Sequence, residues 1–215
     1  MIIDKETNFR EVKTGTIAAG ILCRSSNPLK GGELTKEKLA IKAGINCILN
    51  LDDETCDLNS LSMRVPWYHK LVQENKVIAL KMNFFIPSLT FNRKLKEGLK
   101  FMINCNGPYL VHCYAGVDRA GFVIAILEAL MGASIKEICD DYLLSFDSEY
   151  TSSFTTYFDR REKQIFDQFE KISGEETIND ENIQIIAQNF LLKDVGLSAD
   201  ELNKLTKALK TERVL

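Results

Sequence analysis

The order of strand, loop and helix near the middle of the chain constrains the fold more than any other stretch. Residues 109–112 form a short apolar run, and a polar loop that contains Gly116 follows it. Residues 120–131 then hold a single charged residue, Glu128. An apolar segment of this length predicts a helix that is buried on nearly all sides. A buried helix after a short strand favours an α/β protein, in which helices cover a sheet.

Helices and short strands alternate along most of the chain, which favours a largely parallel central sheet. Ser134 with Glu137 and Ser198 with Glu201 have the spacing of capping boxes, so each pair predicts the start of a helix. We expect one domain over residues 1–215 that ends in a helical extension at about 180–210. The expected helices are 35–43, 90–105 with Thr90 as its N-cap, 135–143, a charged one at 158–172, 183–192 and 198–209, and the further expected strands are 45–51 and 81–86.

The charge balance argues against a nucleic-acid-binding protein, because the 215 residues carry a net charge of -3 and no long basic run. The first residues have charges from Asp4 onward and no apolar stretch of signal-peptide length. The most apolar stretch, 120–127, is far too short to span a membrane. The six cysteines form no C-x-x-C pair. Free thiols in a reducing cytoplasm are therefore expected, while export without a cleaved signal peptide stays open.

The loop after the strand has the chemistry of an anion site. Its sequence, from Leu110 to Gly121, is LVHCYAGVDRAG. Successive backbone N–H groups that lead into a helix N-terminus bind anions, and the guanidinium group of Arg119 can hold two phosphate oxygens in a fork. The same N–H groups favour a thiolate, which would make Cys113 a nucleophile. We expect His112 to orient the loop through a hydrogen bond rather than to transfer protons.

The loop HCYAGVDRAG resembles the signature loop of the cysteine-dependent protein tyrosine phosphatases, and more narrowly that of the bacterial tyrosine/serine protein phosphatase family. This resemblance implies a three-layer α/β fold of the protein tyrosine phosphatase type. It also implies hydrolysis of phosphotyrosine, with phosphoserine and phosphothreonine as further candidates, through a phosphocysteine intermediate, without a cofactor or a metal. Three other stretches resemble the same family: Asn8-Phe-Arg10 with Gly20 and Arg24-Ser25, Asp141-Tyr-Leu-Leu-Ser145, and Val195-Gly-Leu-Ser-Ala-Asp-Glu-Leu202.

The resemblance implies roles for individual residues. Cys113 is expected to be the nucleophile, Arg119 to bind the transferred phosphoryl group, and Asp118 to be the catalytic acid. Supporting roles are expected for His112, Asp52 and Asp53, and substrate contacts for Tyr114, Ala115, Gly116, Val117, Ala120, Arg24 and Ser25.

The sequence departs from the family pattern at three positions. Ala120 replaces a Ser or Thr whose hydroxyl group helps the thiolate to leave, so a slower second step is expected. The turn Leu51-Asp52-Asp53 places an acid where an arginine is common. Val117 stands where members that accept lipid phosphates often carry a lysine, which removes a contact for a second phosphate. For Arg24, an ion pair with Asp52 or Asp53 is the alternative to a place in the pocket.

Asp118 is an unusual residue for a loop that holds an anion. No aspartate lies between Asp57 and Cys113, where most tyrosine phosphatases carry the acid that protonates the leaving oxygen. The loop itself delivers Asp118 to the phosphate, and a bound dianion disfavours a second negative charge beside it. We therefore hypothesise that Asp118 is the acid, with a purely structural role as the alternative and with Asp52 or Asp53 as the next candidate.

Three functions are compatible with such a loop. The leading interpretation is a phosphatase whose partner is a phosphorylated protein or peptide, with phosphate or sulfate held in the loop. The alternatives are a phosphatase for phosphoinositides or inositol phosphates, and a module that binds phosphoproteins with little turnover. Residues 56–80 and 147–172 lack core periodicity and are rich in aromatic residues, so one or both are expected to cover the loop as a lid. The oligomeric state stays open.

Overall fold

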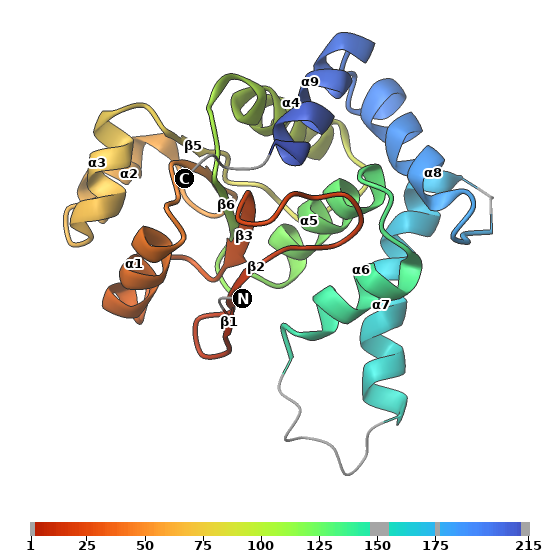
Figure 1. Ribbon diagram of the computed structural model, residues 1–215, viewed down its shortest axis with the longest axis horizontal. Coiled ribbons are helices and arrows are strands. Elements are labelled where there is room, and N and C mark those ends of the chain that lie inside the picture. Colours follow the sequence, from red (N-terminus) through yellow and green to blue (C-terminus); the bar gives the residue numbers. More distant parts are fainter. Residues whose placement is uncertain (1–2, 147–154, 175–176, 212–215) are drawn as a thin grey trace.

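The computed structural model of the chain describes residues 3–146, 155–174 and 177–211 and has a six-stranded sheet at its centre (Figure 1). The strands are β1 Ile3–Asp4, β2 Phe9–Glu11, β3 Leu22–Ser25, β4 Cys47–Asn50, β5 Val77–Ala79 and β6 Tyr109–His112. Their order in the sheet is β1-β2-β3-β6-β4-β5. The four strands from β3 to β5 in this order are parallel, and β1 and β2 extend the β3 edge in antiparallel orientation.

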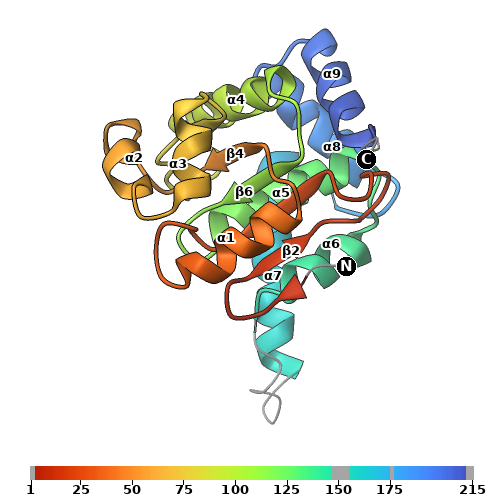
Figure 2. The same ribbon diagram turned by 60° about the vertical axis from the view of Figure 1, so that its left-hand side comes forward.

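Helices cover both faces of this sheet and give three layers (Figures 1 and 2). This arrangement confirms the expected α/β class with helices on both sides of a largely parallel sheet. One face carries α1 Glu33–Lys42, α2 Thr55–Ser62 and α3 Pro66–Gln73. The other face carries α4 Leu89–Asn104 and α5 Asp118–Leu130, around which pack α6 Ile135–Leu143, α7 Thr155–Ser173, α8 Ile183–Asn189, the π-helical turn η2 Phe190–Asp194 and α9 Ala199–Lys210.

Alternation along the strands decides which apolar core each side chain joins, because successive residues point to opposite faces of a sheet. In β4, Cys47 and Leu49 join the core beneath α4 and α5, whereas Ile48 joins the core beneath α1 to α3. In β6, Val111 and Leu110 divide in the same way. Strands that are apolar on both faces are typical of parallel sheets covered by helices on both sides.

The helix starts follow the capping signals where such signals exist. Ser134 and Ser198 form the expected capping boxes at the starts of α6 and α9. The N-cap of α4 is Ser88 rather than Thr90, because the Ser88 hydroxyl accepts a hydrogen bond from the backbone N–H of Phe91 at 3.2 Å. Within the described residues, no helix combines the length and the apolar character that crossing a membrane requires.

One expectation for the middle of the chain is wrong, and one stays a prediction. Leu58, Tyr68 and Leu71 are buried against the sheet, so only other parts of residues 56–80 are left for the expected cover, which stays a prediction. Residues 81–86 form no strand; the strand of this region is β5, which pairs with β4. Of the second expected cover, residues 147–154 lie outside the described part of the chain, and α7 contains the rest.

Candidate active site

The register of the sheet brings three strand ends together at one edge. β6 pairs in parallel with β3 and with β4, so that His112 lies beside Ser25 on one side and beside Asn50 on the other. The residues that follow these strands meet at the carboxyl edge, which is the usual place for a site in a parallel sheet. After β6 comes Cys113, which is 3% exposed. The loop 113–117 then leads directly into α5.

The carbonyl groups of residues 114–117 are held on the outside of the loop. Their donors come from segments that precede the loop by about 80 residues or more in the sequence. The contacts are Asn27 N to Tyr114 O at 3.0 Å, Asn8 Nδ2 to Ala115 O at 3.2 Å and to Gly116 O at 3.1 Å, and Arg24 Nη2 to Gly116 O at 2.8 Å and to Val117 O at 3.4 Å.

Outward carbonyl groups turn the backbone N–H groups of residues 115–118 inward, because a trans peptide unit points its C=O and its N–H in opposite directions. In the described part of the chain, no acceptor pairs with these N–H groups. They lie in a row next to Cys113 at the start of α5. Such a row of donors is suited to hold an anion.

Asp141 of α6 fixes the two side chains that hold the loop. Oδ2 of Asp141 lies 2.6 Å from Nη1 of Arg24, and Oδ1 lies 2.8 Å from Nε of Arg10. Arg10 also donates to the side-chain oxygen of Asn8. Burial opposes ionisation of Asp141, but the charges of Arg24 and Arg10 hold its pKa below the usual range. Asp141 is therefore an anion that anchors both Asn8 and Arg24.

Glu128 of α5 lies close to the same charges. Burial, and then the charge of Asp141, raise the pKa of Glu128 well above its usual value. Its side chain accepts a hydrogen bond from Thr14 Oγ1 at 2.8 Å. Arg10 and Arg24 therefore face Asp141 and a second carboxyl group whose ionisation is disfavoured.

Arg24 and Ser25 do not line the pocket, contrary to the expectation from sequence. Both side chains are 0% exposed, because β3 lies beneath the loop between β2 and β6. The ion-pair partner of Arg24 is Asp141, not Asp52 or Asp53. Arg24 donates hydrogen bonds to carbonyl groups of the loop. Its own side chain has no exposed surface that could contact a substrate.

Two glycines permit the close contact between the loop and its support. Gly116 has a φ of 74°, and a Cβ atom there would lie 2.4 Å from the carbonyl oxygen of Ser25. A Cβ atom at Gly121 would lie 2.8 Å from the ring of Tyr142 and 3.1 Å from Nη2 of Arg24. A larger residue at Gly116 would push the loop away from β3. A larger residue at Gly121 would push α5 away from α6.

Arg119 is held by the segment that follows β4. Its Nη2 donates to Asp52 Oδ1 at 2.9 Å, and its Nη1 donates to Leu51 O at 3.0 Å and to Met82 O at 3.3 Å. Partial burial opposes ionisation of Asp52, but hydrogen bonds from Lys30 and Arg119, among others, lower its pKa to about 2. An ionised Asp52 is suited to positioning Arg119 and is a poor proton donor.

Asp53 belongs to a chain of hydrogen bonds that ends beneath Cys113. Nδ2 of Asn50 donates to Asp53 Oδ2 at 2.9 Å and to the Tyr68 hydroxyl oxygen at 3.1 Å. The same hydroxyl group lies 3.0 Å from Nε2 of His112. His112 is 0% exposed, and burial lowers its pKa to about 3. A neutral, buried His112 can orient the base of the loop but offers no proton to a substrate.

Asp118 and Tyr114 lie at the exposed rim of the loop. Asp118 is the first residue of α5 and accepts a hydrogen bond from Nε2 of Gln164, in α7, at 3.0 Å. Tyr114 is 64% exposed, and Nζ of Lys30 lies 5.6 Å from its ring centroid. A role of α7 as a cover stays a prediction. Of the other expected substrate contacts, Ala115 is exposed, Val117 is half-buried, and Ala120 is fully buried behind the loop.

Three residues at this site received no role from the sequence: Asn8, Lys30 and Asp141. Asn8 and Asp141 lie in stretches that resemble the family, but the sequence does not indicate what either side chain does. Asn8 has a φ of 52°, a conformation that asparagine tolerates better than most residues. Lys30 lies in a stretch whose pattern gave no signal. Tyr68, in the aromatic-rich stretch 56–80, is 0% exposed and packs in the core.

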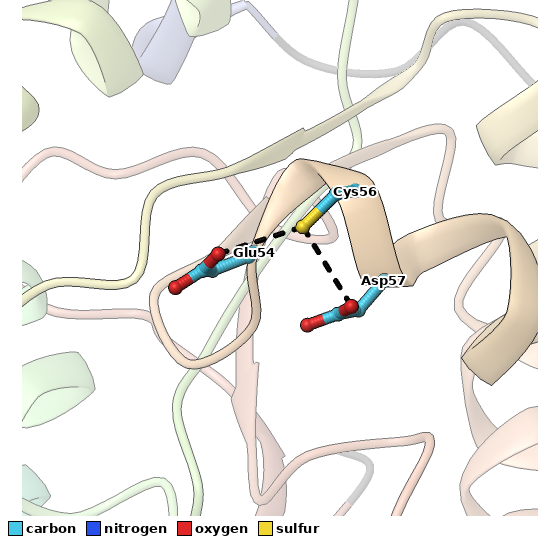
Figure 3. A group of neighbouring side chains, drawn as sticks. All are labelled: Glu54, Cys56 and Asp57. Carbon is cyan, nitrogen blue, oxygen red and sulfur yellow. Dashed lines mark hydrogen bonds between the residues drawn. The ribbon is translucent and has the colours of Figure 1, made fainter.

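One group of side chains in the described residues has the composition of a metal site. Glu54, Cys56 and Asp57 lie at the start of α2, with ligand atoms within 4.8 Å of one another (Figure 3). The hydrogen bond to Glu54 is the largest of the effects that raise the pKa of the Cys56 thiol. Lys81 also forms an ion pair with Glu54. A protonated thiol and an adjacent lysine fit a metal ion poorly.

The chain belongs to the tyrosine phosphatase family, whose model matches residues 3–211. A 41-residue stretch, 19% of the chain, is 49% identical to the triple specificity protein phosphatase PtpB of Mycobacterium tuberculosis. That stretch covers 15% of the relative, far less than two thirds of its length. The chain also matches the core catalytic domain of the PP-IP phosphatase SIW14 from S. cerevisiae with a TM-score of 0.46 and 20% identity, over 84% of this chain and 91% of that chain.

Proposed function

We propose that the chain is a cysteine-dependent phosphatase for phosphomonoesters, with phosphotyrosine in proteins as the favoured substrate. The observation that carries this proposal is the outward fixation of the carbonyl groups of residues 114–117, which turns a row of N–H groups toward Cys113. A phosphoryl group bound there would also meet the guanidinium group of Arg119.

In the first step, the Cys113 thiolate attacks phosphorus. A sulfur–phosphorus bond forms as the bond from phosphorus to the ester oxygen breaks. Asp118 transfers its proton to the leaving oxygen, which departs as the free phenol of tyrosine. The inward N–H groups and Arg119 stabilise the charge on the three remaining oxygens.

In the second step, water attacks phosphocysteine. Asp118, now a carboxylate, accepts a proton from the water while the new oxygen–phosphorus bond forms. The sulfur–phosphorus bond breaks and restores the Cys113 thiolate, and inorganic phosphate leaves. Ala120 offers no hydroxyl group to stabilise the departing thiolate, so we propose that this step is slow.

The depth of Cys113 supports phosphotyrosine over phosphoserine. A phosphate must descend below the rim to reach a sulfur atom whose residue is only 3% exposed. A phenyl ring between the peptide backbone and the phosphate supplies that reach, which a serine side chain lacks. The exposed ring of Tyr114 can pack against such a phenyl ring at the rim. The short likeness to a triple specificity protein phosphatase supports a protein substrate. A reducing cytoplasm would suit a thiolate nucleophile and six free cysteines.

The test is release of phosphate from a phosphotyrosine peptide, a phosphoserine peptide, a phosphoinositide and an aryl phosphate. We expect the phosphotyrosine peptide to have the highest kcat/KM among the biological esters. Cys113→Ser should lower turnover by at least about a thousandfold and retain binding of inorganic phosphate, because serine keeps the loop but is a weak nucleophile. Cys56→Ser, a change at an exposed cysteine of α2, is the matched control and should keep full activity.

Each other outcome has a distinct meaning. Measurable turnover by Cys113→Ser would show that Cys113 is not the nucleophile. Preference for the phosphoinositide would favour a lipid substrate. Tight phosphate binding by the unmodified chain without release from any ester would favour a binding module.

A further inference from the structure

The guanidinium group of Arg119 has only one edge left for a ligand. An arginine side chain carries five N–H groups. Nη1 uses both of its N–H groups on Leu51 O and Met82 O, and Nη2 uses one on Asp52 Oδ1. The remaining two, on Nε and Nη2, are adjacent on one edge of the planar group. Arg119 can therefore grip two oxygens of one phosphoryl group and has no donor for another.

Asp52 fixes this arrangement because its second oxygen is occupied as well. Oδ2 of Asp52 lies 2.7 Å from Nζ of Lys30 and 3.0 Å from Nδ2 of Asn27. Asp52 is 10% exposed, so its charge is little screened by water. Asp52 thus joins the two cations of this rim, Arg119 and Lys30, through one carboxylate.

Lys30 is a nearby cation that could bind a second phosphate, but its ammonium group already pairs with two carboxylates. Its Nζ lies 2.7 Å from Asp52 Oδ2 and 2.8 Å from Asp53 Oδ1. Any further anion at Lys30 would lie next to two carboxylates. Like charges at such short range repel strongly when water is partly excluded.

The charges around the mouth of the loop therefore favour one phosphate and oppose two. Arg119 and Lys30 are positive and Asp52 and Asp53 are negative on one side of the loop, whereas the exposed Asp118 lies on the α7 side, where Gln164 bonds both to Asp118 and to Arg161. A single phosphoryl group is compensated by the loop N–H groups and the open edge of Arg119. Among the described residues next to Asp52, a second group finds no cation that is not already paired with a carboxylate.

We infer that Asp52 is a specificity-determining residue that restricts the site to substrates with a single phosphate group and excludes adjacent second phosphates, as in diphosphates and inositol polyphosphates. The inference rests on the proposed function, since it assumes that the loop binds phosphate. The inference separates substrates that carry one monoanionic or dianionic phosphoryl group from substrates that hold two phosphoryl groups close together.

The test compares two phosphonates that cannot be hydrolysed, methylphosphonate and methylenebisphosphonate, by calorimetric titration of the unmodified chain and of Asp52→Asn. We expect the unmodified chain to bind methylphosphonate at least as tightly as the bisphosphonate, despite the greater charge of the latter. Asp52→Asn keeps the shape and the acceptor for Arg119 but removes the charge. It should shift the ratio of the two dissociation constants at least tenfold toward the bisphosphonate.

Glu54→Gln is the matched control, because Glu54 is a rim carboxylate paired with Lys81 and not with Arg119. It should leave the ratio unchanged. Asp52→Ser replaces Asp52→Asn if the latter does not fold, as judged by circular dichroism. The inference would be overturned if the ratio in the Asp52 variant stayed within twofold of the ratio in the unmodified chain. It would also be overturned if the unmodified chain bound neither phosphonate, or if it strongly preferred the bisphosphonate. Failure of the proposed function is separately visible as phosphonate binding without release of phosphate from any ester.

Discussion

Nη1 of Arg24 lies 2.6 Å from Oδ2 of Asp141, and this buried ion pair joins β3 to α6 beneath the phosphate loop. The two residues are 117 positions apart in the sequence. Both side chains are buried, yet Arg24 holds two of the loop carbonyl groups whose orientation shapes the proposed anion site. The loop is thus shaped by charges behind it as well as by its own sequence.

Asp141→Asn should destabilise the protein by about 3–5 kcal/mol, because it leaves Arg10 and Arg24 buried without a counter-charge. The measurement is urea unfolding followed by circular dichroism. Asp140→Asn is the matched control, since Asp140 is exposed and pairs with Lys136 in a surface contact that should contribute less than about 1 kcal/mol. Equal loss of stability in both variants would contradict the anchoring role of Asp141.

His112 should make the stability of the protein depend on pH below neutrality. The folded pKa is lowered from 6.5 to about 3, so the unfolded chain binds a proton in this range that the folded chain does not. Stability is therefore full above pH 6.5 and falls as the pH drops toward 3, by at most about 5 kcal/mol for this group. Denaturant unfolding at a series of pH values measures the slope.

The control for this prediction uses the second histidine of the chain. His112→Gln should remove this contribution to the slope, although it costs stability at neutral pH, whereas His69→Gln keeps His112 and should retain it. A slope between pH 6.5 and 4 that is unchanged in His112→Gln would show that carboxylates alone cause it.

Asp118→Asn should slow hydrolysis of phosphotyrosine by about a hundredfold or more, because the leaving phenolate then lacks a proton donor. An activated aryl phosphate, whose leaving group needs no proton, should lose much less rate. The alkaline limb of the kcat profile should flatten. Equal loss on both substrates with an unchanged profile would make Asp118 structural. Asp52 would then be a weak replacement, because its pKa of about 2 and its ion pairs hold it as an anion.

Ala120→Ser should speed hydrolysis of the phosphocysteine intermediate by about fivefold, since one added hydrogen bond to the leaving thiolate contributes about 1 kcal/mol. Stopped-flow measurements with an aryl phosphate should show a smaller initial burst and a faster steady state. Ala125→Ser, at another buried position of α5, controls for the cost of burying a hydroxyl group. A burst that stays the same in Ala120→Ser would mean that the second step does not limit turnover.

The parts of the site that the sequence predicted are those that it encodes locally. The strand β6, the loop and α5 are consecutive, and their apolar and glycine pattern needs no information from elsewhere. Arg24 was assigned wrongly because its partner, Asp141, depends on how α6 packs on α5. The helices α2 and α3 were not predicted because neither begins with a side-chain cap, although Pro66 stands at the start of α3. The position of Asp52 beside Arg119 required the strand register of the sheet.

The contacts of Asn8 and Arg24 with the loop, and the ion pair of Arg10 with Asp141 behind it, also bear on the order of folding. Each contact closes a long segment of chain, with separations of 92 to 131 residues among Asn8–Gly116, Arg24–Gly116 and Arg10–Asp141. Closures of that length form late, because the entropy that they cost is recovered only when the surrounding core is in place. The carbonyl groups of the loop are thus oriented only after the N-terminal strands and α6 have docked. Phosphate affinity would consequently appear at the end of refolding, and a partly folded chain would carry a thiol at Cys113 without the means to use it.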